Sequence, residues 1–158
     1  MTESSIAEKI REKKKAFLAR EQEIVESAKS LLIDHHVDKI TVAEIAKKAS
    51  IGKGTIYKHF QTKNEILVRI MLDYEKGISV ELKKGLDRAK EGDPGAVSKA
   101  YFESRLANPA DDRLVQKLED KLADAEDVKE QMMQFYQIRR SLEELSLIHI
   151  SEPTRLRS

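Results

Sequence analysis

Residues 41–60, TVAEIAKKASIGKGTIYKHF, are the stretch from which the organisation of the whole chain can be worked out. Thr41 and, three residues later, Glu44 have the spacing of a capping box, which predicts a helix that begins at Val42. Apolar residues then recur at the spacing of one helix face. They are Val42, Ile45, Ala46 and Ala49. These features predict a short amphipathic helix.

A tight turn and a second helix follow. Residues 50–52, Ser-Ile-Gly, interrupt the helical spacing with turn-forming residues around one apolar side chain. Residues 53–60 then predict a helix in which Ile56 and Phe60 lie one turn apart on the inward side. The other side carries Lys53, Thr55, Tyr57, Lys58 and His59. Two short helices joined by a tight turn are typical of a helix-turn-helix, whose second helix enters the major groove of DNA.

The order of residues also resembles one protein family. Thr-Val-x-x-Ile-Ala, a short turn, Lys-Gly-Thr-Ile-Tyr-x-His-Phe and then Thr-Lys-x-Glu-Ile-Leu resemble the DNA-binding head of the TetR family of bacterial transcriptional regulators. The resemblance runs from about residue 23 to residue 72. The family usually has Gly-Val-Ser where residues 50–52 of this chain read Ser-Ile-Gly, a departure that affects the backbone of the turn and the cap of the second helix.

The resemblance implies a DNA-contact surface on the second helix. Lys53, Thr55 and Tyr57 would face the major groove, and Lys58 and His59 would lie at its edge toward the phosphates. For Tyr57, packing into the core between helices is the alternative. An isolated lysine at any of these positions is also compatible with simple solvation.

Three further residues complete the predicted surface. Gly54 has no side chain, so the backbone there can approach DNA closely; the alternative is that it fits against a neighbouring helix. Thr41 and Lys63, at the starts of the flanking helices, would hold the DNA backbone on either side.

Composition limits the class of protein. The chain has 158 residues, 36% of them charged, only 5% aromatic and none cysteine, which excludes disulfides and thiolate metal sites. We expect a cytoplasmic protein that does not interact with a membrane, because no apolar run reaches the length of a membrane span and no signal-peptide core is present. Residues 1–70 hold 14 basic and 10 acidic residues, whereas residues 71–144 hold 13 and 17, so the front of the chain is the basic part.

We expect an all-α fold: an N-terminal three-helix head with the helix-turn-helix, followed by an incomplete antiparallel helical bundle. Residues 1–20 are predicted to be a basic N-terminal arm or helix extension, residues 21–72 the DNA-binding domain and residues 73–144 a partial effector-binding domain. The basic cluster of the arm either tracks phosphates, enters a minor groove or is a solvated terminus. Its residues are Lys9, Arg11, Lys13, Lys14 and Lys15.

Helical spacing predicts four helices after the helix-turn-helix. The first begins after Thr62, with Glu65 completing a second capping box, and runs to residue 91; Gly77 and Gly85 mark a bend or a break in it. A loop at residues 92–95 separates it from helices at residues 96–107 and 111–123. Asp127 is expected to cap the last helix, whose inward residues are Val128, Met132, Phe135 and Leu142.

The end of the chain requires a different explanation. Residues 145–155, LSLIHISEPTR, are what results from translating a transposon end and adapter used to prepare sequencing libraries. We therefore expect the natural sequence to stop near Glu144 and residues 145–158 to be a non-native tail. TetR-like chains usually continue for two more helices that pair two subunits, so we expect the dimerisation helices to be missing here. The full-length protein would bind a palindromic operator in double-stranded DNA as a homodimer.

The resemblance further implies a repressor released by a small-molecule effector, bound in an apolar pocket of the rear helices. Candidate lining residues are Tyr74, Ile78, Tyr101, Phe102, Met132, Phe135 and Tyr136, for which ordinary core packing is the alternative. We expect no enzyme, cofactor or metal site, because no nucleophile–base pair, metal cluster or phosphate-binding glycine loop is visible. The alternative function is a helical protein–protein adaptor that reuses the helix-turn-helix scaffold without binding DNA.

Overall fold

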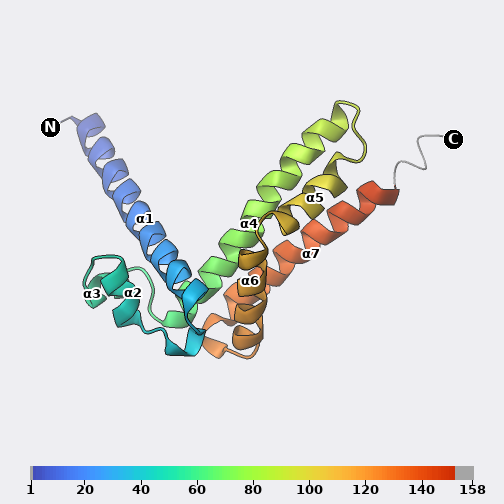
Figure 1. The fold of residues 1–158 in the computed structure, drawn as a ribbon. Helices are drawn as coiled ribbons and strands as arrows, with labels where there is room; N and C mark the ends of the chain where they lie inside the picture. The colour runs from blue at the N-terminus through green and yellow to red at the C-terminus, as the bar shows by residue number, and fades with distance from the viewer. Residues whose placement is uncertain (1, 152–158) are drawn as a thin grey trace. The chain divides into compact units, whose positions relative to one another are not determined.

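The computed structural model describes the backbone of residues 2–151 and the side chains of residues 2–148 (Figure 1). The helices are α1 (Glu3–Asp34), η1 (Val37–Lys39), α2 (Val42–Lys48), α3 (Lys53–Tyr57), α4 (Lys63–Lys90), α5 (Ala96–Ala107), α6 (Pro109–Leu122), η2 (Glu126–Val128) and α7 (Lys129–Ser151). Between residues 2 and 151 there is no strand, which confirms the predicted all-α class. The chain divides into two compact units, residues 1–66 and residues 67–158.

The core of the first unit lies between the second half of α1 and the helix-turn-helix. From α1, Ile24, Val25 and Ala28 are buried, and from α2, Ile45 and Ala46 are buried. These two helices pack against each other, and α2 packs against α3. The head is therefore the three-helix arrangement that the sequence predicts.

The start of α2 is the predicted capping box. The Thr41 hydroxyl oxygen accepts a hydrogen bond from the Glu44 N–H at 3.2 Å, and the Glu44 carboxylate accepts one from the Thr41 N–H at 2.9 Å. At the start of α4 the Glu65 N–H donates to the Thr62 hydroxyl at 3.3 Å, which is half of the second predicted box, and the Glu65 carboxylate accepts from the Gln61 N–H.

The turn between α2 and α3 places Ser50 in the left-handed region, with φ of 57°. The Ile51 N–H donates to the Ala46 carbonyl at 3.0 Å and the Ser50 N–H donates to the Lys47 carbonyl at 3.2 Å, which is the Schellman pattern of a helix C-terminus. This pattern requires a left-handed residue at position 50, where glycine would be unstrained. Gly52 has φ of −75°, which any residue adopts, so the glycine of this turn is not at the position that needs it.

The second helix of the motif is shorter than predicted. We expected a helix over residues 53–60, but α3 ends at Tyr57. The chain then tightens, because the Lys58 N–H donates to the Thr55 carbonyl and the His59 N–H to the Ile56 carbonyl, each three residues back. Ile56 and Phe60 are nevertheless both buried, with 0% and 6% of their surface exposed, so the predicted inward side is confirmed.

In the second unit, α4 is one continuous helix to Lys90 instead of two. Gly85 allows α5 to approach it closely, because a Cβ at position 85 would lie 2.8 Å from the Ala96 carbonyl oxygen and 2.9 Å from the Ala100 Cβ. Around this contact Ile78, Leu82, Val97 and Leu142 form a buried cluster drawn from α4, α5 and α7. The predicted loop at residues 92–95 is present, and Gly92 takes φ of 111° there.

The remaining helices differ from the prediction at their ends. α6 begins at Pro109, two residues before the predicted start, because the Asn108 side chain caps it by accepting from the Asp111 N–H. Asp127 lies within η2, two residues before α7 begins at Lys129, and its capping of that helix stays a prediction. The predicted inward residues of this region are all buried. They are Val128, Met132, Phe135 and Leu142.

α7 continues past Glu144 to Ser151, and the Ser98 hydroxyl donates to the Ser146 carbonyl at 3.3 Å. Residues 145–151 of the predicted tail are thus helical, while residues 152–158 lie outside the described residues. The origin of residues 145–158 stays a prediction.

Candidate nucleic-acid interface

The outward side of α3 carries most of the predicted DNA-contact residues. Lys53, Gly54, Tyr57 and Lys58 are exposed, and Thr55 is half-buried. Tyr57 exposes 47% of its surface, so it does not pack into the core. Ile56 and Phe60, on the opposite side, are buried in the core, so the exposed residues face away from it.

Gly54 faces open space. Outside its own helix, no described part of the chain lies within 4 Å of the position that a Cβ would take. The alternative that Gly54 fits against a neighbouring helix is therefore wrong. The backbone at position 54 is therefore open to an external molecule.

His59 does not lie at the edge of this surface, in contrast to the sequence interpretation. Its side chain is only 3% exposed, and its Nδ1 lies 3.2 Å from the Glu21 carboxylate. Its ring stacks on Phe17 with 4.0 Å between the ring centroids. Because the imidazole is enclosed by two side chains of α1, the prediction that His59 meets phosphates does not fit its position.

Lys63 and Thr41 support the head from within. The Lys63 ammonium donates to the carbonyls of Val37 and Ile40, both at 3.0 Å, and so ties the start of α4 to the segment that contains η1. The Thr41 hydroxyl oxygen is the acceptor of the capping box. Lys63 is half-buried and Thr41 is exposed, so Thr41 is the more accessible of these two flanking residues.

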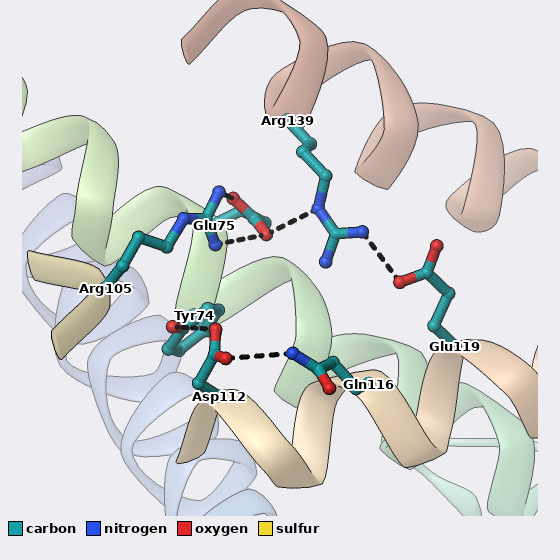
Figure 2. Close-up of polar contacts among 7 residues, drawn as sticks. All are labelled: Tyr74, Glu75, Arg105, Asp112, Gln116, Glu119 and Arg139. Carbon is teal, nitrogen blue, oxygen red and sulfur yellow. Dashed lines mark hydrogen bonds and ion pairs between the residues drawn. The ribbon is translucent and has the colours of Figure 1, made fainter. Parts of the chain in front are cut away.

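A second polar site, which the sequence analysis missed, lies in the second unit (Figure 2). The Glu75 carboxylate is fully buried and accepts two hydrogen bonds from Arg105, both at 3.0 Å, and one from Nε of Arg139 at 3.1 Å. Arg139 also donates to Glu119 at 2.7 Å. These residues come from α4, α5, α6 and α7, so one ion-pair network joins four helices.

Beside this network the Tyr74 hydroxyl donates to Asp112 at 2.8 Å, and Gln116 donates to the same carboxylate at 3.0 Å. Burial and then the hydrogen bond to Asp112 raise the pKa of Tyr74 to about 12. Burial by itself would lower the pKa of Arg105, but the hydrogen bonds and charge of Glu75 outweigh it and raise that pKa above its ordinary value. Both groups therefore keep their protons across the physiological range.

A signal for Glu75 was present in the sequence. Met71, Glu75, Ile78 and Leu82 have the spacing of one helix face, and all four are buried in α4. A carboxylate on an apolar stripe needs a cationic partner, because burying an unpaired charge is costly. The spacing thus predicts a buried ion pair, although it does not say which arginines form it.

Comparison with known proteins identifies the head. Residues 24–70 match the family model described as bacterial regulatory proteins, tetR family. This head is a TetR-family domain. The resemblance drawn from the sequence is thereby confirmed.

Two individual proteins are similar to the chain, one in sequence and one in fold. The chain is 31% identical over 62 residues to YxbF of Bacillus subtilis strain 168, an uncharacterized HTH-type transcriptional regulator; the match covers 39% of this chain and 16% of that protein. A crystal structure assigned to the TetR family, from Shewanella sp. PV-4, shares the fold with a TM-score of 0.53 and 21% identity, covering 87% of this chain and 69% of that one. The chain therefore spans less than a fifth of the curated relative that it matches.

The predicted effector-pocket residues behind the TetR-family head do not share one environment. Ile78 is buried in the α4–α5–α7 cluster, against which Tyr74 and Tyr101 pack. Met132 and Phe135 are buried, whereas Phe102 and Tyr136 are 54% and 40% exposed. Met132 and Tyr136 line a surface recess of about 290 Å³ at the start of α7.

Among the described residues no group of three or more His, Asp or Glu side chains could hold a metal ion. None of the helices between residues 2 and 151 is both long enough and apolar enough to cross a membrane. His35 and His36 are engaged locally, the first near the Leu31 carbonyl at 3.1 Å and the second accepting from the Asp38 N–H at 3.2 Å.

Proposed function

We propose that this TetR-family chain is a DNA-binding transcriptional regulator whose head meets duplex DNA through the outward side of α3. One observation carries the proposal: Lys53, Gly54, Tyr57 and Lys58 are exposed together on a helix whose opposite side is anchored in the core. In a helix-turn-helix, the second helix is the one that reads base edges in the major groove.

Each side chain has a chemical use in this interface. Lys53 and Lys58 supply charge to phosphates or to the acceptor edge of guanine, and Tyr57 supplies a flat apolar face and a hydroxyl. Gly54 brings the backbone N–H groups close to the DNA. Thr55 is half-buried, so only part of its side chain is open to the DNA.

The proposal is tested by measuring the affinity of the chain for a mixed-sequence duplex over a range of salt. Phosphate contacts make log K fall linearly with log salt, by about 0.9 for each phosphate neutralised. Lys58→Ala should lower this slope by about one unit without a loss of stability. Lys90→Ala, at the exposed end of α4, is the matched control and should leave the slope unchanged. An adaptor without DNA binding would show no salt-dependent association with any duplex.

Lys63→Ala distinguishes a phosphate contact from a structural one. Because the Lys63 ammonium donates to two carbonyls of the chain, its removal should reduce the free energy of unfolding. The salt slope should then change by less than it does in Lys58→Ala. If Lys63→Ala lowers the slope of log K against log salt by about one unit and leaves stability unchanged, Lys63 contacts a phosphate.

We further propose that the regulator acts as a homodimer on a palindromic operator. A single head offers few base contacts, and two heads on half-sites about 34–36 Å apart, or a multiple of this, supply useful specificity. When two copies of the chain are joined covalently, selection of bound duplexes from a randomised library should enrich an inverted repeat. Enrichment of a single, non-repeated site would contradict the dimeric reading.

Repression and its release by a small molecule are the finer part of the proposal. The family relationship supports them, and the recess beside Met132 and Tyr136 is the candidate site. Compounds that raise the melting temperature of the chain should lower its affinity for the selected operator, because a ligand must bind the two states differently to shift them. Stabilising compounds that leave operator affinity unchanged would count against effector release.

A further inference from the structure

The first half of α1 extends beyond the core of the head. Residues 3–20 are exposed apart from the half-buried Ser5, whereas buried residues of α1 begin at Ile24. At 1.5 Å per residue this half of the helix is about 27 Å long. Because it is helical, it is too wide for a minor groove of about 6 Å, so the sequence reading in which it enters that groove as an arm does not fit.

Residues 9–20 of this exposed half carry a strongly positive charge. Between residues 9 and 20 there are six basic residues and one acidic residue, Glu12. Lys13, Lys14 and Lys15 are consecutive and exposed. A charge of this sign and density complements a row of phosphates.

The structure also fixes where this charge lies relative to α3. His59, two residues after the last residue of α3, is held between the Phe17 ring at 4.0 Å and the Glu21 carboxylate at 3.2 Å. Lys13 and Lys14 precede Phe17 by four and three residues, so they share the helix face that meets His59. The basic turn of α1 is thus continuous with the C-terminal end of α3.

Two other cations of the same segment point elsewhere. Arg11 and Lys15 precede Phe17 by six and two residues, which places them more than a quarter-turn away from its face. Both are exposed. The helix therefore supplies a matched pair of cations on the face toward α3 and another pair that faces away.

We propose that the Lys13 and Lys14 face of α1 is a second DNA-contact surface, which binds the phosphates flanking the site occupied by α3. The inference rests on the proposed function and adds a partner surface to it. The contacts of His59 with Phe17 and Glu21 fix the position of the Lys13 and Lys14 face relative to α3. His59 thus positions the interface without touching the DNA.

The test compares two double variants with the same loss of charge, binding to a mixed-sequence duplex about three helical turns long. Lys13→Gln/Lys14→Gln should lower the slope of log K against log salt by about two units, at 0.9 for each phosphate. Arg11→Gln/Lys15→Gln should leave the slope close to that of the unchanged chain. Circular dichroism confirms that both variants remain helical.

The outcomes separate this inference from the proposed function. If the unchanged chain shows no salt-dependent duplex binding, the proposed function fails. If it binds but Lys13→Gln/Lys14→Gln retains the full slope, only the second surface is overturned. Equal losses in the two double variants also overturn it, because they indicate a long-range field and not contacts from one face.

Exposed apolar residues on α1 raise the alternative that this helix binds a second copy of the chain and not DNA. Ile6 and Ile10 expose 48% and 61% of their surface, and Ile10 lies two turns before Phe17. A second copy of the chain would cover them. If Ile6→Ser/Ile10→Ser converts a self-associated chain to a monomer in sedimentation while Lys13→Gln/Lys14→Gln leaves the slope intact, the face binds protein and the inference is wrong.

Discussion

Glu75→Gln should destabilise the second unit far more than any surface substitution. The change removes the negative charge between Arg105 and Arg139, while the side chain keeps nearly the same volume. One of the two carboxylate oxygens becomes an NH₂ group, which faces the N–H donors of an arginine and cannot bond them. Glu75 is fully buried, so water does not replace the lost partner.

The magnitude follows from the exposure of the arginines. Breaking a buried ion pair costs about 3–5 kcal/mol. The side chains of Arg105 and Arg139 are 17% and 22% exposed, so part of the stranded charge is hydrated and the cost should lie near the lower end. A loss of about 3 kcal/mol corresponds to a drop in melting temperature of about 6–12 °C for a chain of this size.

Urea denaturation followed by circular dichroism measures this change. Glu81→Gln is the matched control, because Glu81 also pairs with a cation, Lys84 at 2.8 Å, but the pair is more than half exposed. The control should change the free energy of unfolding by about 0.5 kcal/mol or less. If Glu75→Gln costs no more than the control, the network does not hold the four helices together and the reasoning is refuted.

Three further predictions concern single positions. Ser50→Gly should stabilise the chain by about 1 kcal/mol, because it removes the strain of a left-handed backbone at φ of 57°. An unchanged midpoint of urea unfolding would show that Ser50 is not strained. Gly54→Ala should keep or slightly raise the stability of the chain and weaken its binding to a duplex. Gly77 also faces open space, so Gly77→Ala should raise stability without changing the affinity for the duplex. If the two variants bind the duplex with equal affinity, Gly54 is not part of the interface. The contribution of Tyr74 to stability is present below pH 10 and should be lost as the pH rises through about 12, because burial and the bond to Asp112 raise its pKa from 10.0 to about 12. Tyr74→Phe should not show this alkaline loss when urea unfolding is measured across that range, and an identical pH profile would assign the loss to other groups.

The parts of the fold that could be predicted are those that depend on neighbours in sequence. The capping box at Thr41 and Glu44 and the buried pair Ile56 and Phe60 depend on spacings of three and four residues, which the sequence shows directly. The strain at Ser50 was foreshadowed in the same way, since the expected glycine of the turn is displaced to position 52.

The parts that could not be predicted depend on contacts between distant residues. His59 and Lys63 have the chemistry of phosphate contacts, and nothing within a few residues shows otherwise. Their actual partners lie 38 residues away for His59, and 26 and 23 residues away for Lys63. Tertiary packing therefore decided the direction of both side chains.

The predicted effector-pocket residues lie in different environments for a related reason. Its residues were chosen because they are aromatic or apolar at helical spacing, and such residues also form ordinary cores. Ile78, Met132 and Phe135 are buried, whereas Phe102 and Tyr136 face outward. Of the polar residues that join the helices, Glu75 could be detected from the sequence, because it is a charged residue at the spacing of an apolar helix face.

The proposed function depends on contact between the outward side of α3 and DNA. Its most direct test replaces Tyr57, 47% exposed on α3, with a photo-crosslinking analogue and irradiates the chain with a mixed-sequence duplex. Val80, 54% exposed on α4, receives the same analogue as the control. If α3 meets the duplex, position 57 should form a crosslink to it that fades as salt is raised, and position 80 should form none. Crosslinks of equal yield from both positions, or from position 80 alone, would contradict it.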